Sequence, residues 1–351
     1  LSWDLPFSLG SAASHWHIGV DTRHDDITPL GLHLTKSRQR YATIREDDVR
    51  QTLTALWTSL STQWTPWLRS EIGARADRFE YDVASNLATN SGSGNDTIVS
   101  PKVSMALGPW RDTELFIATG RGFHSNDARG ATIAVDPLDG VTPVERVSPL
   151  AKATGSEVGV RTAVLPRTQL SASLWQLDLE SELLFVGDGG TTEATRPSRR
   201  QGVELSLYSK PRDWMIIDAD YAWSKPRFRD SDPAGDRIPG AVSAAASLGI
   251  ALDLPSGWFG GVRLRYLGPA ALIEDDSVRS PSSTLVNVSA GRRFGERWKL
   301  SAGIYNLLDR RANDIAYFYE SQLPGESAPV ADIHFHPVEP RQVRATAHVN
   351  F

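Results

Sequence analysis

The sequence contains no cysteine, which excludes disulfide bonds and thiolate metal sites and suits an extracytoplasmic protein. It contains no run of 18 apolar residues, so no transmembrane helix is expected. It has no excess of positive charge, because its formal net charge is −5 and its pI is about 5.9. Nothing in that charge balance indicates a nucleic-acid partner. Helical periodicity is nearly absent too, which leaves β-structure as the main organising pattern.

The composition is that of a folded chain. Hydrophobic residues make up 40% of the sequence and charged residues 23%, which argues against global disorder. No initiator Met and no signal-peptide pattern precede "LSWDLPFSLG", where Leu1, Trp3, Leu5, Phe7 and Leu9 alternate with polar or small residues. This start inside a strand predicts a fragment or a processed piece of a longer protein.

Alternation with a period of two runs through most of the chain, separated by turn signals. The tail "RQVRATAHVNF" puts apolar residues on one face and Arg344, Thr346, His348 and Asn350 on the other. Soluble domains more often end in frayed polar residues. We expect 14 or 15 strands, near 1–9, 15–27, 49–64, 68–83, 99–108, 113–123, 154–165, 168–187, 199–210, 213–229, 239–253, 257–273, 283–294, 299–308 and 338–351.

Short and long connections alternate between these strands. The short ones lie at 65–67, 108–112, 166–167, 210–213, 255–257 and 295–297. The long ones are rich in Gly, Pro, Ser and Asp, for example 85–97 and 187–200. A sheet with short turns at one end and long loops at the other is typical of bacterial outer-membrane barrels, whose periplasmic turns are short and whose extracellular loops are long.

Tryptophan and charge patterning point the same way. Trp67, Trp110, Trp214, Trp258 and Trp298 lie in or beside short turns, as in an aromatic girdle at a membrane boundary. Within "GVRLRYLG", apolar residues alternate with two arginines, which fits a charged lumen wall. Two alternatives stay open: a soluble sandwich, which alternates with its apolar side inward, and a β-propeller with a repeat of similar length.

Three segments resemble the TonB-dependent receptors of Gram-negative outer membranes. These are "SAGIYNLLDRRANDIAYFY" (301–319), the tail "EPRQVRATAHVNF", and the strand–turn–strand segment 101–130. The resemblance extends over nearly the whole chain. It implies an all-β fold, an antiparallel transmembrane β-barrel of 22 strands, of which this chain would supply 14 or 15. The family's N-terminal plug is absent from the sequence, so residues 1–351 are expected to form a single partial barrel domain.

The resemblance also implies a function. Such a receptor binds a scarce solute at the cell surface and takes it up with energy coupling, the solute being a ferric siderophore, haem, cobalamin or an oligosaccharide. Implied partners are the TonB complex, contacted through the missing plug, the outer-membrane assembly machinery, lipid and lipopolysaccharide. The terminal Phe351 would be part of the assembly signal. A passive porin-like channel is the alternative, and a soluble periplasmic binding module or enzyme is a third reading.

No catalytic pattern is present: the sequence has neither Gly-x-Ser-x-Gly nor His-Glu-x-x-His. We therefore expect no enzyme and no cofactor. The "HFH" pair supplies two ligands, whereas a metal site normally needs three or four. The candidates for solute binding are Arg121, His124, Asn126, Arg129, His334 and His336. Arginine suits the carboxylates or phosphates of such ligands, although Arg121 and Arg129 could equally pair with lumen carboxylates or lipopolysaccharide.

Overall fold

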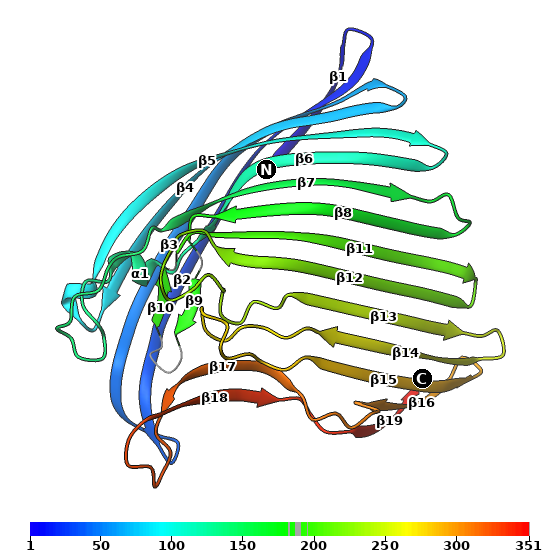
Figure 1. Cartoon of the computed structure of the whole chain (residues 1–351). Coiled ribbons are helices and arrows are strands. Elements are labelled where there is room, and N and C mark those ends of the chain that lie inside the picture. The colour runs from blue at the N-terminus through cyan, green and yellow to red at the C-terminus, as the bar shows by residue number, and fades with distance from the viewer. Residues whose placement is uncertain (182, 187–190, 195, 351) are drawn as a thin grey trace. The chain divides into compact units, whose positions relative to one another are not determined.

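A computed structural model describes residues 1–181, 183–186, 191–194 and 196–350, with the backbone alone for 183–186 and 191–194. Strands dominate it (Figure 1). The bounds are β1 (Ser2–Leu9), β2 (Ala12–Lys36), β3 (Gln39–Thr65), β4 (Leu68–Ser85), β5 (Gly92–Trp110), β6 (Thr113–Ser125), β7 (Leu150–Thr162), β8 (Thr168–Leu179), β9 (Leu183–Val186), β10 (Thr191–Ala194), β11 (Ser198–Arg212), β12 (Met215–Phe228), β13 (Ala244–Asp253), β14 (Trp258–Leu267), β15 (Ser283–Phe294), β16 (Trp298–Tyr305), β17 (Asn313–Ser321), β18 (Val330–Pro337) and β19 (Gln342–Val349), with the 3₁₀ turn η1 (Ala88–Asn90) and the helix α1 (Ala128–Thr132).

The main sheet has fifteen strands in the order β1 to β8, β11 to β16 and β19, and β9–β10 and β17–β18 form separate hairpins. This confirms the expected all-β antiparallel fold and the expected strand number. The chain divides into two compact units. The first unit is 1–107, 117–156 and 177–198, and the second is 108–116, 157–176 and 199–351. Strands β5, β6, β7, β8 and β11 contribute residues to both.

In the first unit, one face of β1 to β5 is apolar. One row of register partners across the five strands reads Leu5, Trp16, Leu60, Ile72 and Val103. Four of these side chains are exposed, with Ile72 at 58% of its full accessibility. We call this side the apolar face. Strand residues alternate between faces, so every second residue from Leu68 to Ala76 lies on the apolar face. The length of this stretch is close to the roughly 9–11 residues that a tilted strand needs to cross a bilayer.

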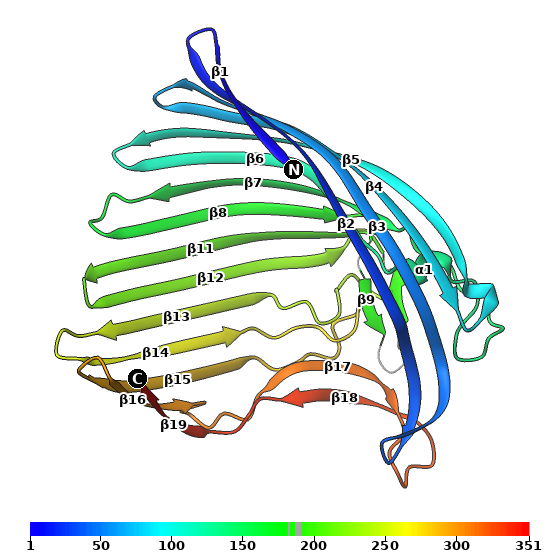
Figure 2. The same cartoon turned by 180° about the vertical axis from the view of Figure 1, so that it is seen from behind.

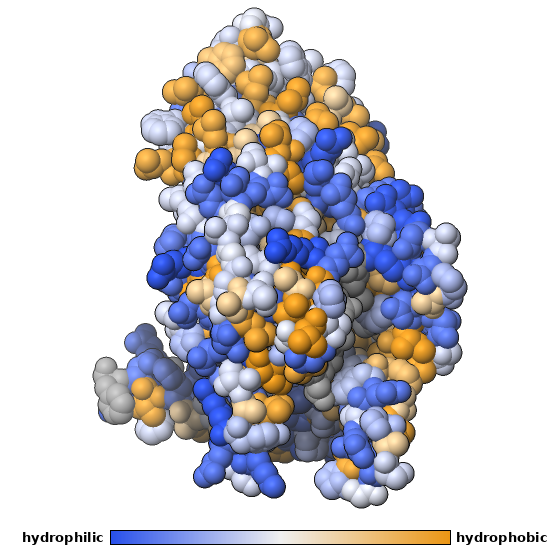
Figure 3. All heavy atoms as spheres, turned by 90° about the vertical axis from the view of Figure 1, so that its left-hand side faces the viewer, coloured by the Kyte–Doolittle hydropathy of each residue, from blue (hydrophilic) through white to orange (hydrophobic). Residues whose placement is uncertain are grey.

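The apolar face ends at a definite level along the strands. The last apolar row joins Val20, Leu56 and Val99 through Ala76, and two residues further the row is Thr22, Thr54, Arg78 and Thr97. We call the end beyond this level the loop end, and the opposite one the short-turn end. In Figure 3 orange side chains gather at the top, where Figure 1 places the turn between β1 and β2, and blue side chains are more frequent below.

The opposite side of the strands, the polar face, carries cross-strand ion pairs. Lys102 Nζ lies 2.6 Å from Glu71 Oε1. Arg75 contacts both Asp21 at 2.7 Å and the fully buried Asp77 at 2.9 Å. These contacts need strands in the observed register, because a shift by one residue would turn each partner to the other face.

The second unit repeats the two-faced pattern. One row runs through Ile217, Ile250, Val262, Val288, Ile304 and Val343 on six successive strands. On the other face Arg263 makes a bidentate contact of 2.9 and 3.1 Å with Asp218. A Cβ on Gly249, between them, would lie 2.4 Å from the Asp218 carboxylate. A glycine there leaves room for the ion pair across three strands.

The tryptophans of the short turns are largely exposed. Trp67, Trp110, Trp258 and Trp298 each expose 46–49% of their accessible surface, and Trp214 is half-buried. An indole beside a turn with its ring exposed suits a membrane–water boundary. Partly exposed indole rings beside these turns agree with the expectation from the sequence.

The largest correction concerns 28–48, which was expected to be a loop. Strands β2 and β3 instead continue through it as a hairpin of 25- and 27-residue strands with its turn at Ser37–Arg38. Figure 2 shows this hairpin running past the end of β4. The expected long loop at 85–97 is also shorter, because β5 begins at Gly92. The strict alternation of short and long connections is therefore wrong at β2–β3.

Other boundaries differ as well. The strand expected over 168–187 ends at Leu179, and β9 is a separate element. Strand β13 begins five residues later than expected, at Ala244, and β14 ends at Leu267 rather than 273. The hairpin β17–β18 and the helix α1 were not expected. Phe351 and the Gly-rich segment 187–190 lie outside the described residues. Within the described residues no helix is long and apolar enough to cross a membrane.

If the apolar face meets lipid, adjacent residues of β5 should respond oppositely to one added charge. Val103 lies on the apolar face, whereas Ser104 is the register partner of Glu71 on the polar face. Val103→Lys should destabilise the folded protein by about 2–4 kcal/mol, the cost of a cation in mid-bilayer. Ser104→Lys should be tolerated. Urea titration of the full-length protein in lipid, followed by gel mobility, measures both; equal effects would contradict a lipid-facing apolar face.

Candidate functional site

The segment 126–149 between β6 and β7 packs on the polar face of the first unit, at the loop end. Two small clusters of buried side chains connect this segment to the sheet. Val49 and Val83 from the sheet pack with Ala128 of α1. Phe79 and Ile98 pack with Leu150, where β7 begins. Such clusters on a face that is otherwise charged show that the loop covers the polar face rather than standing free of it.

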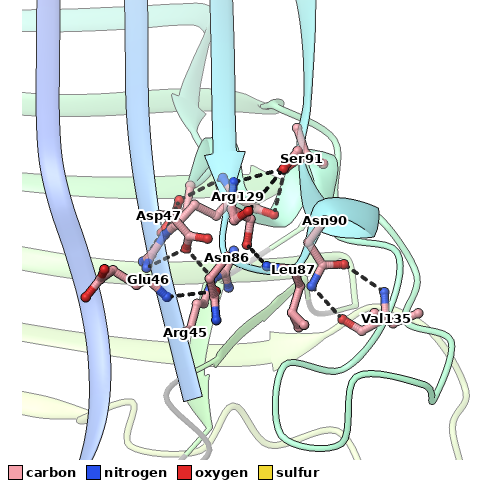
Figure 4. A network of polar contacts seen from close by, with 12 residues as sticks. Arg45, Glu46, Asp47, Asn86, Leu87, Asn90, Ser91, Arg129 and Val135 are labelled. Carbon is pink, nitrogen blue, oxygen red and sulfur yellow. Dashed lines mark hydrogen bonds and ion pairs between the residues drawn. The ribbon is translucent and has the colours of Figure 1, made fainter. Parts of the chain in front are cut away.

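A network of four charges, two of them buried (Arg45 and Asp47) and two half-buried (Asp127 and Arg129), holds α1 to β3 (Figure 4). Asp47 has no exposed side-chain surface, and its Oδ2 accepts from Arg45 Nε at 2.5 Å and lies 3.7 Å from Arg129 Nη1. Arg129 also binds Asp127, with its Nη2 2.6 Å from Asp127 Oδ2. Two guanidinium groups thus face two carboxylates, which balances the charge at a partly buried site.

Asp127 has a second role as the N-cap of α1. Its Oδ1 accepts from the backbone N–H of Arg129 at 2.9 Å. Burial raises the pKa of Asp127, but the hydrogen bonds and charge of Arg129 outweigh it and hold the pKa below its ordinary value. Burial lowers the pKa of Arg129, and the two carboxylates more than reverse this. Both groups therefore stay charged near neutral pH.

Asn90 binds the backbone in the middle of the same loop. Its side chain is almost fully buried, and its Oδ1 accepts from the backbone N–H groups of Ala134 and Val135 at 2.9 and 3.0 Å. Its Nδ2 donates to the carbonyl of Val135 at 3.0 Å. Figure 4 shows this amide reaching from the η1 turn toward Val135. An amide engaged on both sides fixes one orientation of the loop.

The structure puts the sequence-predicted candidates in different settings. Asn126 is buried and closes the base of the loop, with its Nδ2 2.6 Å from the carbonyl of Ser148. Arg129 lies in the charge network. His124 is half-buried, and its Nε2 has no partner among the described residues. Asn126, His124 and Arg129 thus belong to one loop region, and two of them bind the loop itself.

Arg121 lies elsewhere on β6. Two-residue alternation puts it on the side of Ile117, which belongs to the apolar face and is 55% exposed. A Cβ on Gly120, its neighbour, would instead contact Lys102 of the polar face. This placement separates Arg121 from Lys102 and the charges of the polar face.

His334 and His336 belong to the second unit, on β18. The His334 ring stacks on Tyr319 of β17 with centroids 3.9 Å apart, and its Nε2 is buried without a hydrogen-bond partner among the described residues. His336 is exposed, two residues further on. In the parts of the chain that the structure describes, no group of three or more His, Asp or Glu side chains is placed to hold a metal ion.

The second unit also has a depression of about 620 Å³ beside the short turn at 108–112, and Glu114 and Arg161 line it. Arg161 Nε donates to Glu114 Oε2 at 2.6 Å. Gln169 and Tyr208 line the same depression. Its charged and amide groups are suited to polar solutes, and no sequence motif pointed to it.

Comparison with known proteins identifies the family. The model of the TonB dependent receptor-like β-barrel matches residues 1–307. The chain belongs to this family. Among solved structures it is similar to the ferric-catecholate import receptor Fiu of E. coli K12 in its closed form, with a TM-score of 0.72 and 17% identity over 100% of this chain and 54% of that one. It is also similar to the ferric citrate transporter FecA in its unliganded form, with a TM-score of 0.74 and 15% identity over 100% of this chain and 53% of that one.

A third similar structure is the ferric yersiniabactin uptake receptor FyuA of Yersinia pestis, with a TM-score of 0.67 and 17% identity over 99% of this chain and 57% of that one. The chain thus spans about half the length of these receptors. At such low identity the likeness shows a shared fold. It confirms the resemblance seen in the sequence, with an antiparallel sheet that matches part of a TonB-dependent receptor barrel.

Neutralising Asp47 should free the 126–149 loop. Asp47→Asn leaves the buried Arg45 without its carboxylate partner and Arg129 with Asp127 alone, and breaking a buried ion pair costs roughly 3–5 kcal/mol. Hydrogen exchange of 126–149 should rise while that of β13–β15 stays unchanged. The control is Glu80→Gln, which removes a pair with Arg78 that is exposed on both sides and should change little. An unchanged loop in Asp47→Asn would contradict the anchoring role.

Acid should loosen the same loop. The pKa of Asp127 is lower in the folded protein than in the unfolded chain, so its contribution to stability is fully present above the unfolded value and is lost as pH falls through the folded one. The chain lacks cysteine, so a nitroxide on Leu138→Cys can report loop mobility between pH 3 and 7. Mobility should rise below about pH 4. Asp127→Asn should be mobile at every pH; a pH-dependent transition retained in that variant would contradict the assignment.

Proposed function

We propose that this chain is the lipid-embedded barrel segment of an outer-membrane TonB-dependent receptor in a Gram-negative bacterium. The observation that carries the proposal is the two-faced sheet in a chain of this family. The outward row through Ile72 suits lipid, and the polar face with the pairs of Arg75 and Lys102 suits a water-filled lumen. In this orientation the loop end faces the cell exterior and the segment 126–149 folds into the lumen.

The proposed solute is a ferric siderophore. The similar structures named above are described as receptors or transporters of ferric catecholate, ferric citrate and ferric yersiniabactin. This supports an iron chelate over haem, cobalamin or an oligosaccharide. No comparison favours the passive porin-like channel. Active uptake would further require the TonB complex, acting through the plug domain that membership of the family implies.

For ligand contact we propose His124 in the first unit and, as a separate candidate, the pair His334 and His336 in the second. His336 is exposed, the stacked rings of His334 and Tyr319 beside it offer an aromatic surface to an aromatic chelate, and His124 is half-buried two residues before Asn126. Asn126 and Arg129 would act by positioning the loop. Arg121 would contact phosphates of the outer leaflet. We also propose that Phe351 contributes to recognition by the outer-membrane assembly machinery.

The direct test is uptake of radiolabelled iron by cells that express the full-length receptor, with a panel of ferric siderophores. Uptake of one chelate should disappear when the receptor gene is deleted, and also when TonB is deleted with the receptor present. His124→Ala should weaken binding of that chelate to cells at 4 °C, and Glu80→Gln should not. Uptake that needs the receptor but not TonB would contradict energy coupling and support the passive channel.

A further inference from the structure

The tip of the β2–β3 hairpin carries unpaired positive charge. Between Asp26 and Glu46 the sequence contains no carboxylate residue, yet it contains Lys36, Arg38 and Arg40. All three are exposed, and none of their side chains makes a hydrogen bond or ion pair with a described residue. Arginines nearer the sheet are paired, as Arg50 is with Asp26 and Arg78 with Glu80. The charge at the tip is therefore left without a partner inside this unit.

The backbone makes the tip a defined ribbon. Ser37 and Arg38 have φ values of 50° and 65°, the conformation of a two-residue type I′ turn, which matches the twist of paired strands. Register partners are Lys36 with Gln39 and Thr35 with Arg40. Successive residues face opposite sides, so Lys36 and Arg40 present charge on the two sides of the ribbon and Arg38 at its apex.

The hairpin carries this charge far beyond the apolar face. From Val20, in the last apolar row, to Ser37 the strand extends roughly 55 Å at about 3.3 Å per residue. With the usual tilt of barrel strands the tip stands on the order of 40 Å above the lipid boundary. Phosphates at that boundary lie several Debye lengths away, since this length is about 8 Å at physiological ionic strength. Bilayer headgroups therefore cannot be the partner.

The shape of the hairpin tip indicates which kind of anion it can bind, a small solute or a polymer. A small solute needs a concave site that surrounds it, and a two-stranded turn with cations on both sides has no such lining. A polymer with repeated charges needs none, because several weak contacts add along its length. Tyr41, 66% exposed beside Arg40, adds an aromatic surface with a hydroxyl. Arginine binds phosphate and carboxylate groups with paired hydrogen bonds.

We propose that the β2–β3 tip, formed by Lys36, Arg38, Arg40 and Tyr41, binds an anionic surface polysaccharide, one that carries phosphate or carboxylate groups on its sugars. The proposal rests on the outward orientation of the loop end in the proposed function. Binding there ties the hairpin to the polysaccharide layer, at a site separate from the lumen, and leaves the polar face open to a solute.

The test measures binding of a delipidated, phosphate-bearing core polysaccharide to the purified full-length receptor at 50 and 300 mM NaCl. The variant Lys36→Gln/Arg38→Asn/Arg40→Gln removes three charges and keeps a residue suited to the turn. The control Arg111→Gln/Arg212→Gln/Arg297→Gln removes three exposed charges beside short turns. The tip variant should bind about tenfold more weakly at 50 mM NaCl, as expected for three exposed charge contacts, and should lose most of its salt dependence, while the control should bind like wild type.

Equal binding of the polysaccharide by the tip variant and wild type would overturn the proposal. If the tip variant bound a ferric chelate more weakly but the polysaccharide equally well, the proposal would also fall, and the tip would be assigned to a soluble anion. Labelling of Ser37→Cys on intact cells by a membrane-impermeant maleimide separates this failure from that of the proposed function. Absent labelling would overturn the outward orientation and both proposals with it. Labelled cells with unaffected polysaccharide binding would overturn only the role of the tip.

Discussion

The separation of apolar and polar side chains onto opposite faces of long strands is the constraint on which the rest of this structure depends. With a period of two, a register shift of one residue would bring Arg75 or Arg263 to the side of Ile72 or Val262. Cross-strand ion pairs such as Lys102–Glu71 oppose that shift from one face. Rows of matched apolar residues oppose it from the other. Both sides of the sheet therefore specify the same register in each unit.

The loop-end network follows from where the apolar face stops. Strands β3 and β4 continue past the level of Arg78, so their polar face has room for a small buried core and for the four charges around Asp47. Burying these charges has a large desolvation cost, so the network is weak evidence for added stability. It specifies one position for the 126–149 loop instead. The side-chain oxygen and nitrogen of Asn90 both make hydrogen bonds to the loop, which fixes it further. In the proposed orientation the loop then covers the lumen side of β3 and β4.

The predictable parts of the fold were those that local patterns encode. Alternation, turn residues and tryptophans beside turns identified the sheet and its short-turn end. The β2–β3 extension was missed because Pro29 and Gly31 are residues typical of turns, and because three register shifts interrupt the pairing of its strands between Ile27 and Thr35. Helix α1 has five residues, too few for a helical period. The pairing of Asn90 with Val135 depends on contacts between distant segments, and no local signal marks it.

Of the candidate site, residue type could be predicted but role could not. Arg129 and Asn126 were identified as polar loop residues, and the structure shows them bound to their own loop. A sequence cannot distinguish a guanidinium paired with Asp47, 82 positions earlier, from one open to a ligand. The unpaired charge at Arg38 and Arg40 is more readable, because the neighbouring sequence contains no carboxylate to neutralise it.

The central claim is that the apolar face of β4 meets lipid, and a nitroxide scan from Leu68 to Asp82 in the full-length receptor tests it most directly. Oxygen concentrates in lipid, so collision rates with oxygen should be high at Ile72, Ala74 and Ala76 and low at the residues between them. This alternation should fade beyond Arg78. Collision rates with a water-soluble nickel complex should show the opposite phase. Uniform values along the strand, or the reverse phase, would contradict the account.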